Sequence, residues 1–348
     1  MKNILIVRLS AIGDVALSTA LLPGIRKAWP TAHIHWLTED MGAEVLRGNQ
    51  DIEDLIVVPR KRWTSLLREH RYLTLWRETR ELRKRLRAIE ADMAIDAQGL
   101  LRSAIWTYAS HAKIRIGLRA KEGAQYLMTQ NIRVVGNPTG RMCNEYRCLL
   151  EETGMTATPF SMSLHPTHAA RERALREIPE GARSPVFFYP FTTWPQKHWP
   201  EENWARLAAR VVQELERPVW ILGGPSNEEA ANHIAQQSGV ADRIRVVAGK
   251  SSCIEDKMGL IERGVAAIGV DTGLSHISLG LGTPTVVIFG ATCGYTDTAP
   301  LKGAVLYAKM PCSPCRHHPT CNGDFTCQKR ITVDNAFEVL QQFAWNRR

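Results

Sequence analysis

The chain has 348 residues, of which 44% are hydrophobic and 23% charged, and its formal net charge at pH 7 is +9. This composition excludes disordered chains, collagen, coiled coils and small disulfide-rich scaffolds, and the length predicts two domains. Residues 1–7 are apolar, but Arg8 follows them without a small-residue cleavage site, so we expect no signal peptide. The longest apolar stretch, 265–289, contains Asp271 and His276, which disfavours a membrane-spanning helix and predicts a cytoplasmic protein.

Strands and helices are expected to alternate along the first half of the chain. Residues 3–7 form a short apolar run rich in β-branched side chains, which is typical of a buried parallel strand. A helix with regularly spaced apolar side chains follows at 15–28, and further strands are expected at 33–37, 55–58 and 93–96. This alternation predicts a parallel sheet with helices on both faces.

A second alternation begins after residues 154–183, which are rich in Thr, Pro, Arg and Glu and indicate an interdomain connection. Helices are expected at 204–215 and 228–237. Strands are expected at 186–189, 219–222, 245–247, 266–270 and 285–289. The sequence thus predicts an α/β protein of two Rossmann-like domains, whose ligands bind at the carboxyl ends of the strands. The expected boundaries are 1–160, 175–330 and, for a C-terminal helix, 331–348.

The loop after the first strand contains Asp14 and a single glycine, Gly13. A dinucleotide fingerprint needs three glycines here, so we do not expect an NAD site. Asp14 could simply cap the following helix through its side-chain oxygen. Alternatively, its carboxylate could act as a general base toward an incoming hydroxyl group. The residues alone leave both roles open.

The most informative stretch follows the expected strand at 266–270 and consists of Asp271, Thr272, Gly273, Leu274, Ser275 and His276. A helix that begins here offers free N–H groups and a positive dipole end to a phosphate, and Gly273 allows a close backbone approach. Asp-Thr-Gly alone could be only a helix cap. His276, one turn later, makes a chance occurrence of the pattern much less common.

Two more loops at strand ends carry candidate ligands of a phosphorylated nucleotide. Lys197, with the hydroxyls of Thr192 and Thr193 nearby, could clamp a phosphate, although a plain surface lysine is the alternative. Glu228 could hold ribose hydroxyls, or only occupy a helix N-terminus. The chain contains no Asp-x-Asp motif to hold a divalent metal on a diphosphate. We therefore expect Lys197 and a helix N-terminus to stabilise the charge of the leaving group.

Together these motifs resemble the lipopolysaccharide heptosyltransferases of glycosyltransferase family nine. The resemblance covers nearly the whole chain and rests on residues 8–15, 96–100, 196–201 and 271–276, with 96–100 more similar to the heptosyltransferase I branch. It implies a GT-B fold, with an acceptor-side domain and a nucleotide-sugar-binding domain facing across a cleft. It also implies inverting transfer of heptose from ADP-heptose to the inner core of lipid A, with no cofactor required.

The resemblance also implies roles for single residues. Asp14 would be the general base, Lys197 and the backbone of Thr272 and Gly273 would hold the diphosphate, and Glu228 would lie near the ribose. The expected nucleotide-sugar contacts are Thr192, Thr193, Lys197, Glu228, Asp271, Thr272, Gly273, Leu274 and His276. The expected acceptor-side contacts are Gly13, Arg60, Arg62 and Gln98. A transferase with another acceptor, and a non-catalytic nucleotide-sugar-binding protein on this fold, remain alternatives.

Residues 60–87 contain eleven Lys or Arg side chains and three acidic ones, a net charge of +8. A solvated helix face is one interpretation. No nucleic-acid-binding motif accompanies the run, so we expect no nucleic-acid partner. The interleaved apolar residues, such as Tyr72 and Trp76, suit an anionic membrane surface or an anionic lipid-linked glycan acceptor. This pattern predicts a peripheral protein on the cytoplasmic face of the inner membrane.

Four of the eight cysteines lie close together near the C-terminus, with the spacing C-x2-C-x5-C-x5-C: Cys312, Cys315, Cys321 and Cys327. Such a set could hold a structural zinc or iron ion in a tetrahedral site, with His317 or His318 as a substitute ligand. Only the first pair has a diagnostic spacing. Free or redox-active thiols are therefore the alternative.

Overall fold

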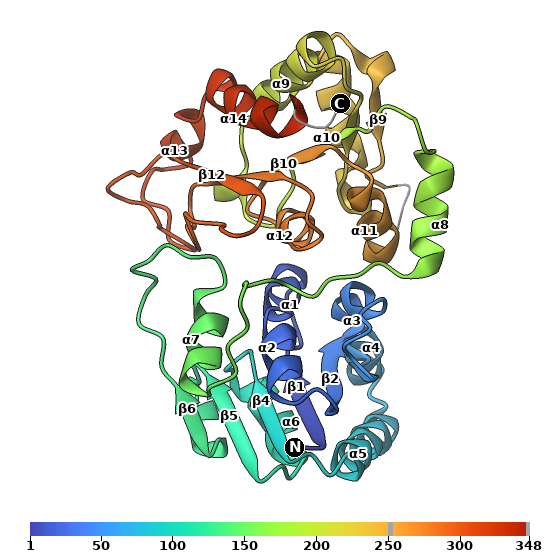
Figure 1. The fold of residues 1–348 in the computed structure, drawn as a ribbon, viewed down its shortest axis with the longest axis vertical. Helices are drawn as coiled ribbons and strands as arrows, with labels where there is room; N and C mark the ends of the chain where they lie inside the picture. The colour runs from blue at the N-terminus through green and yellow to red at the C-terminus, as the bar shows by residue number, and fades with distance from the viewer. Residues whose placement is uncertain (250–252, 346–348) are drawn as a thin grey trace. The chain divides into compact units, whose positions relative to one another are not determined.

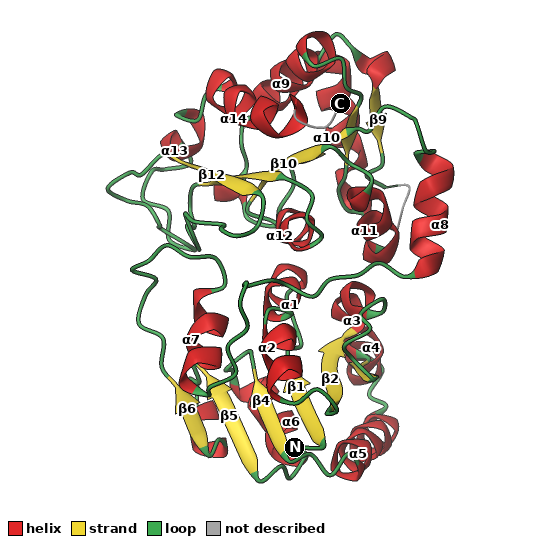
Figure 2. Cartoon of the chain, in the orientation of Figure 1, coloured by secondary structure: helices red, strands yellow, loops and turns green. Residues whose placement is uncertain are grey.

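The computed structural model describes residues 1–249 and 253–345, and the chain divides into two compact units (Figure 1). The first unit comprises Met1–Asn137 and Cys143–His165, and the second comprises Pro138–Met142 and the chain from Pro166 onward. In each unit, helices flank a six-stranded parallel sheet, which confirms the predicted α/β class (Figure 2). Within the described residues, no helix is long and apolar enough to cross a membrane.

The sheet of the first unit has the strand order β3-β2-β1-β4-β5-β6, which is the order of a Rossmann-like domain. Its strands are β1 (Asn3–Val7), β2 (His33–Glu39), β3 (Asp54–Val58), β4 (Met93–Asp96), β5 (Ile114–Leu118) and β6 (Gln130–Ile132). The central strand β1 is buried from residue 4 to residue 7, because parallel strands covered on both faces have no solvent side. Strands β5 and β6, which the sequence analysis did not predict, complete the sheet at one edge.

Helices cover both faces of this sheet. The single helix expected at 15–28 is instead two helices, because Pro23 has no N–H to donate and its ring would clash with the carbonyl of Thr19 in a continuous helix. Buried strand residues pack against α5 and against tryptophans of α4 and α6, so these three helices share one face. The helices are α1 (Ile12–Ser18), α2 (Leu21–Ala28), α3 (Asp40–Leu46), α4 (Arg60–Arg68), α5 (Tyr72–Ala88), α6 (Leu101–Ala109), the 3-10 helix η1 (Ala124–Leu127) and α7 (Asn144–Glu152).

The second unit repeats this plan with the strand order β12-β11-β10-β7-β8-β9. Its strands are β7 (Val186–Tyr189), β8 (Val219–Ile221), β9 (Ile244–Val246), β10 (Ala266–Val270), β11 (Thr285–Phe289) and β12 (Gly303–Tyr307). Its helices are α8 (His168–Glu177), α9 (Glu201–Glu214), α10 (Glu228–Gln237), α11 (Ile254–Glu262), α12 (Gly273–Gly280), α13 (Thr326–Lys329) and α14 (Val333–Trp345), with 3-10 helices η2 (Pro195–Lys197), η3 (Pro225–Asn227) and η4 (Ala241–Arg243).

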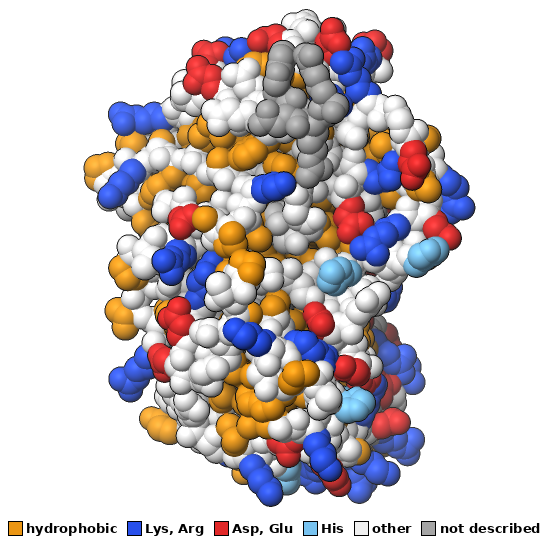
Figure 3. Space-filling model, in the orientation of Figure 1, with side chains coloured by type: hydrophobic (Ala, Val, Ile, Leu, Met, Phe, Trp, Pro, Cys, Tyr) orange, Lys and Arg blue, Asp and Glu red, His pale blue; other side chains and the backbone are white. Residues whose placement is uncertain are grey.

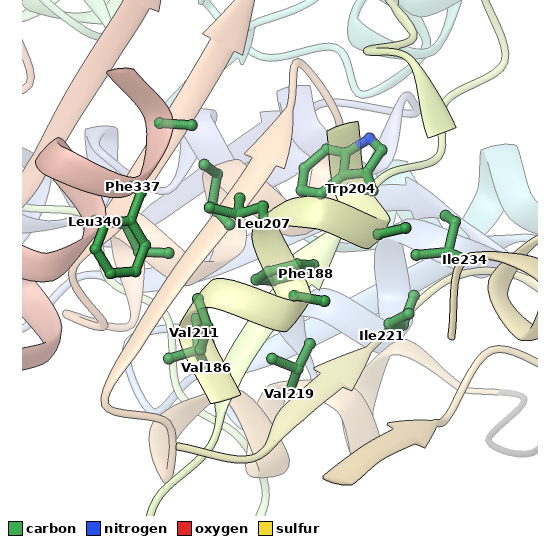
Figure 4. Packing of buried hydrophobic residues seen from close by; sticks show 14 of the residues in the cluster. Val186, Phe188, Trp204, Leu207, Val211, Val219, Ile221, Ile234, Phe337 and Leu340 are labelled. Carbon is green, nitrogen blue, oxygen red and sulfur yellow. The ribbon is translucent and has the colours of Figure 1, made fainter. Parts of the chain in front are cut away.

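The core of the second unit lies between its sheet and the helices α9, α10 and α14 (Figure 4). Trp204 and Leu207 of α9 point toward Phe188 of β7, and Phe337 of α14 packs beside them. These apolar contacts fix the sheet as a rigid platform. The loops at the carboxyl ends of β7 and β10 carry most of the predicted donor-side residues.

Candidate functional site

In the first unit, the loop after β1 holds the candidate base against a buried arginine. Arg8 Nη2 lies 2.6 Å from Asp14 Oδ2, and Arg8 Nη1 donates to the carbonyl of Ala97 at 2.7 Å. The Arg8 side chain is 10% exposed, whereas that of Asp14 is 48% exposed. Asp14 is thus held in place by one oxygen and still reaches solvent, which suits a group that must accept a proton.

Asp14 also has a weak structural role at the start of α1. It occupies the first helical turn and accepts a hydrogen bond from the backbone N–H of Ala11, the N-cap residue, at 3.4 Å. The N-cap position itself belongs to Ala11. Asp14 is therefore not the N-cap residue itself, but its side-chain oxygen supports the start of α1 through this long contact, so both interpretations stay open.

Two other predicted acceptor-side residues lie at the same edge of the first sheet, and a third does not. Gln98 Oε1 accepts the N–H of Leu9 at 2.9 Å, which ties the loop after β4 to the loop after β1. Arg60 Nη1 lies 3.1 Å from Glu39 Oε2 at the end of β2. Arg62 instead pairs with Glu78 of α5 at 2.6 Å.

Sequence reasoning missed the residues that join these loops. Arg102 Nη1 lies 2.8 Å from Glu39 Oε1, and Arg102 Nη2 donates to Ser10 Oγ at 3.0 Å. Glu39 therefore holds two arginines at this edge. The only sequence signal for it was its place at the carboxyl end of a buried strand.

In the second unit, Asp271 is the centre of a buried polar network. Its Oδ2 lies 2.7 Å from Lys197 Nζ and accepts a hydrogen bond from Thr292 Oγ1 at 2.5 Å. Its Oδ1 lies 3.1 Å from His276 Nε2, and His276 Nδ1 lies 3.0 Å from the hydroxyl of Tyr295. We call Lys197, Asp271, His276, Thr292 and Tyr295 the Asp271 network.

Electrostatics keep Asp271 ionised in this network. Burial alone would raise the pKa of Asp271, but the hydrogen bonds and charges of His276 and Lys197 outweigh it and hold the pKa well below its usual range. Since an ionised carboxylate can only accept, His276 Nε2 must carry the proton.

Lys197 belongs to this network and is not a plain surface lysine. Its side chain is 14% exposed, and Nζ lies 4.4 Å from the ring centroid of Trp194. An ammonium group has three donors, and the ion pair with Asp271 uses one of them. The others remain for an anionic ligand.

The remaining predicted donor-side residues surround this network or lie in a neighbouring pocket. Thr272 is the N-cap of α12, whose first residues include Gly273 and Leu274 and begin directly beyond Asp271. Thr192 and Thr193 line a cavity of about 440 Å³. Glu228 begins α10 and lines a separate pocket of about 1010 Å³.

The four clustered cysteines line one small cavity of about 60 Å³ as free thiols: Cys312, Cys315, Cys321 and Cys327. Burial raises the pKa of Cys315 and of Cys327, which favours their neutral form. In residues 1–249 and 253–345, no group of three or more His, Cys, Asp or Glu side chains is placed to hold a metal ion. His317 packs its ring on Trp194 instead, with centroids 3.6 Å apart. The expected zinc or iron site is therefore not supported.

Comparisons with known proteins agree with the motifs at these loops. The family model for glycosyltransferase family 9 (heptosyltransferase) matches residues 79–325. Lipopolysaccharide heptosyltransferase 1 of Pseudomonas aeruginosa is 28% identical over 95% of this chain and 91% of its own length. The enzyme of the same name from Escherichia coli K12 is 26% identical over 83% of this chain and 88% of its own length.

Solved structures show the same fold at lower identity. A family 9 glycosyl transferase from Veillonella parvula has a TM-score of 0.79 and 21% identity over 99% of this chain and 97% of its own. E. coli heptosyltransferase WaaC, solved with ADP-2-deoxy-2-fluoro heptose, has a TM-score of 0.72 and 23% identity over 97% of this chain and 98% of its own. The predicted GT-B fold class is thus confirmed. The chain is a glycosyltransferase, and it belongs to glycosyltransferase family 9, the heptosyltransferases.

Proposed function

We propose that this protein transfers heptose from ADP-heptose to the inner core of lipopolysaccharide, on a Kdo- or heptose-bearing lipid A acceptor. The lipopolysaccharide heptosyltransferases to which it is similar over most of its length support this assignment. The observation that carries it is the Asp271 network, which lies within the matched region and holds an ammonium group beside the start of α12. A cation beside a helix N-terminus is suited to a diphosphate.

The proposed donor chemistry follows from this network. Lys197 and the free N–H groups of Thr272 and Gly273 bind the diphosphate of the donor. As the bond between the anomeric carbon and the phosphate oxygen breaks, negative charge grows on that oxygen. Lys197 is already oriented by Asp271, so it stabilises the ADP leaving group without reorganisation. No metal ion is needed in this mechanism, because the protein supplies the positive charge.

The proposed acceptor chemistry uses Asp14 as the general base. Asp14 Oδ1 takes the proton of the acceptor hydroxyl while the hydroxyl oxygen attacks the anomeric carbon, opposite the departing ADP. One C–O bond forms and one breaks, so the anomeric configuration inverts. Arg8 occupies Oδ2 and fixes the orientation of the carboxylate. A purely nucleotide-sugar-binding protein has no use for this carboxylate.

The proposed acceptor is lipid-linked, so the enzyme has to work at a membrane surface. We infer a peripheral location on the cytoplasmic face of the inner membrane, where ADP-heptose and a growing inner core meet. The net charge of +8 in residues 60–87 fits an anionic partner of this kind.

The decisive experiment is transfer by the purified protein from ADP-heptose to Kdo-bearing lipid A. We expect a product heavier by one heptosyl residue, with inverted configuration by NMR, in the presence of EDTA. UDP- and GDP-linked sugars serve as donor controls. Tight binding of ADP without transfer to any inner-core acceptor would leave only a binding function and refute the proposal.

A further inference from the structure

Large hydrophobic side chains that face solvent are concentrated on one helical layer of the first unit. Thirteen such side chains stand out in the described part of the chain, and seven of them lie on α4, α5 and α6. Scattered single residues need no explanation, but a contiguous group marks an interaction surface. These seven are Leu67, Tyr72, Leu73, Trp76, Leu101, Ile105 and Tyr108.

Helix α5 carries apolar and basic side chains on the same outward face. Leu82 and Leu86 point to the core, so the opposite side of the helix faces solvent. Leu73 and Trp76, at its N-terminal end, are 77% and 57% exposed. The next turns of this side carry Arg77, Arg80, Arg83, Lys84 and Arg87. Glu81 is the one exposed acidic side chain of α5, so the outward side of this helix is apolar and predominantly basic, as interfacial membrane helices typically are.

Most of the basic side chains on this face have no internal partner. Arg62 and Arg85 pair with Glu78 and Asp54, at 2.6 and 2.7 Å. In contrast, four side chains have no ion pair in the described part of the chain: Arg77, Arg83, Lys84 and Arg87. Figure 3 shows Lys and Arg side chains gathered over α4 and α5, at the lower right of that view.

Arg80 joins the two chemical parts of the face, because its guanidinium lies 5.3 Å from the ring centroid of Trp76. Tryptophan combines a large apolar ring with a polar N–H, and it is favoured where hydrocarbon meets headgroups. Arginine next to it can reach lipid phosphates while its stem covers the apolar ring. Trp76 therefore suits the boundary between hydrocarbon and headgroups, and Arg80 suits the phosphate layer beside it.

We propose that the outward face of α4, α5 and α6 is a docking surface for an anionic phospholipid bilayer. Leu73 and Trp76 enter the boundary between headgroups and acyl chains, and Arg77, Arg83 and Lys84 bind lipid phosphates. This proposal rests on the proposed function, which requires contact with a lipid-linked acceptor. Nucleic acid fits less well, since the apolar side chains project outward from helices that show no recognition motif.

The magnitude of the charge effect sets the scale of the test. A basic residue near an anionic surface strengthens binding roughly fivefold, and screening acts over about 8 Å at physiological ionic strength. Replacing four unpaired cations with Gln should therefore weaken vesicle binding on the order of 100-fold or more at low salt.

The test compares two variants for sedimentation with vesicles of phosphatidylcholine, with or without phosphatidylglycerol. The patch variant is R77Q/R83Q/K84Q/R87Q. The matched control, K27Q/R133Q/R176Q/K309Q, removes the same charge from exposed sites elsewhere. Only the patch variant should lose binding to phosphatidylglycerol vesicles, and added salt should weaken wild-type binding. Equal losses in both variants, or binding indifferent to salt, would overturn the proposal.

Two further readouts separate this proposal from the proposed function. Brominated lipid should quench the fluorescence of the wild type more than that of W76F; equal quenching refutes insertion at this helix. Transfer to a deacylated, soluble acceptor should be unchanged in the patch variant, whereas transfer to a vesicle-embedded acceptor should fall. If the wild type fails to glycosylate the soluble acceptor, the proposed function is refuted. The sedimentation assay then still decides whether this surface binds the bilayer. If the patch variant loses binding to RNA or DNA but keeps its binding to vesicles, the surface binds nucleic acid and the bilayer proposal is refuted.

Discussion

Replacing Asp14 with Asn separates the proposed catalytic role of this carboxylate from its structural one. Asn has the same shape and can still accept hydrogen bonds from Ala11 and Arg8, but it cannot take a proton from the acceptor. One variant therefore tests both roles. The loss of basicity affects catalysis, whereas the retained side-chain position leaves the structural contacts largely in place.

The two roles predict effects of very different size. The ion pair to Arg8 involves a half-exposed carboxylate, and such pairs contribute up to about 1 kcal/mol. Arg8 also keeps its hydrogen bond to Ala97. The melting temperature should thus fall by only about 2–4 °C. Loss of a general base, in contrast, lowers kcat by roughly 10²–10⁴-fold.

The assay measures kcat for heptose transfer, the ADP affinity by calorimetry and the melting temperature of Asp14→Asn. We expect kcat to fall at least about 100-fold, with an unchanged ADP affinity. Glu202→Gln, in the first turn of α9, is the control for losing a carboxylate at a helix start. A kcat within a few fold of wild type, combined with the small loss of stability, would show that Asp14 only supports the helix.

Three more predictions concern the second unit and the metal. Lys197→Ala should weaken ADP binding about 10–100-fold and also lower kcat, because a charge-assisted hydrogen bond contributes about 1.5–3 kcal/mol; an unchanged affinity by calorimetry would contradict this. Asp271→Asn should lower the free energy of unfolding by about 3 kcal/mol at pH 7. Since the folded pKa of Asp271 lies below the ordinary value of 3.8, this contribution exists above pH 3.8 and is lost on further acidification, so denaturant titrations of wild type and variant should converge there. Transfer should be unaffected by EDTA, and prompt inactivation that Mg²⁺ reverses would refute the metal-free mechanism.

The buried strands were predictable because each of them is a run of consecutive apolar residues. β1 and β10 are flanked on both sides and carry no polar residue that interrupts the run. The strands that escaped prediction lie toward the edges of the sheets. β5 contains Arg115 and Gly117, and β12 is half-buried along its whole length, so neither has the pattern of a covered strand.

The site residues also divide into some that the sequence identified and others that it missed. Lys197 and His276 were recognisable because each lies within a few residues of a motif at the end of a strand. Thr292 and Tyr295 were not, since they reach Asp271 and His276 only through the packing of β11 beside β10. A contact between residues about twenty positions apart has no signature in a single sequence. The catalytic and binding roles of these residues stay predictions.

The proposed mechanism gives a reason for burying the Asp271 carboxylate beside Lys197, the ammonium group proposed to bind the diphosphate. The Lys197 side chain is only 14% exposed, and its Nζ lies 2.7 Å from Asp271 Oδ2. The ion pair with Asp271 holds Lys197 in a defined position, and His276 and Thr292 form hydrogen bonds with the same carboxylate. In the proposed mechanism, the diphosphate then meets an ammonium group whose orientation needs no adjustment. Preorganisation of this kind would lower the barrier of the proposed transfer step, because the site is already ordered before the donor binds.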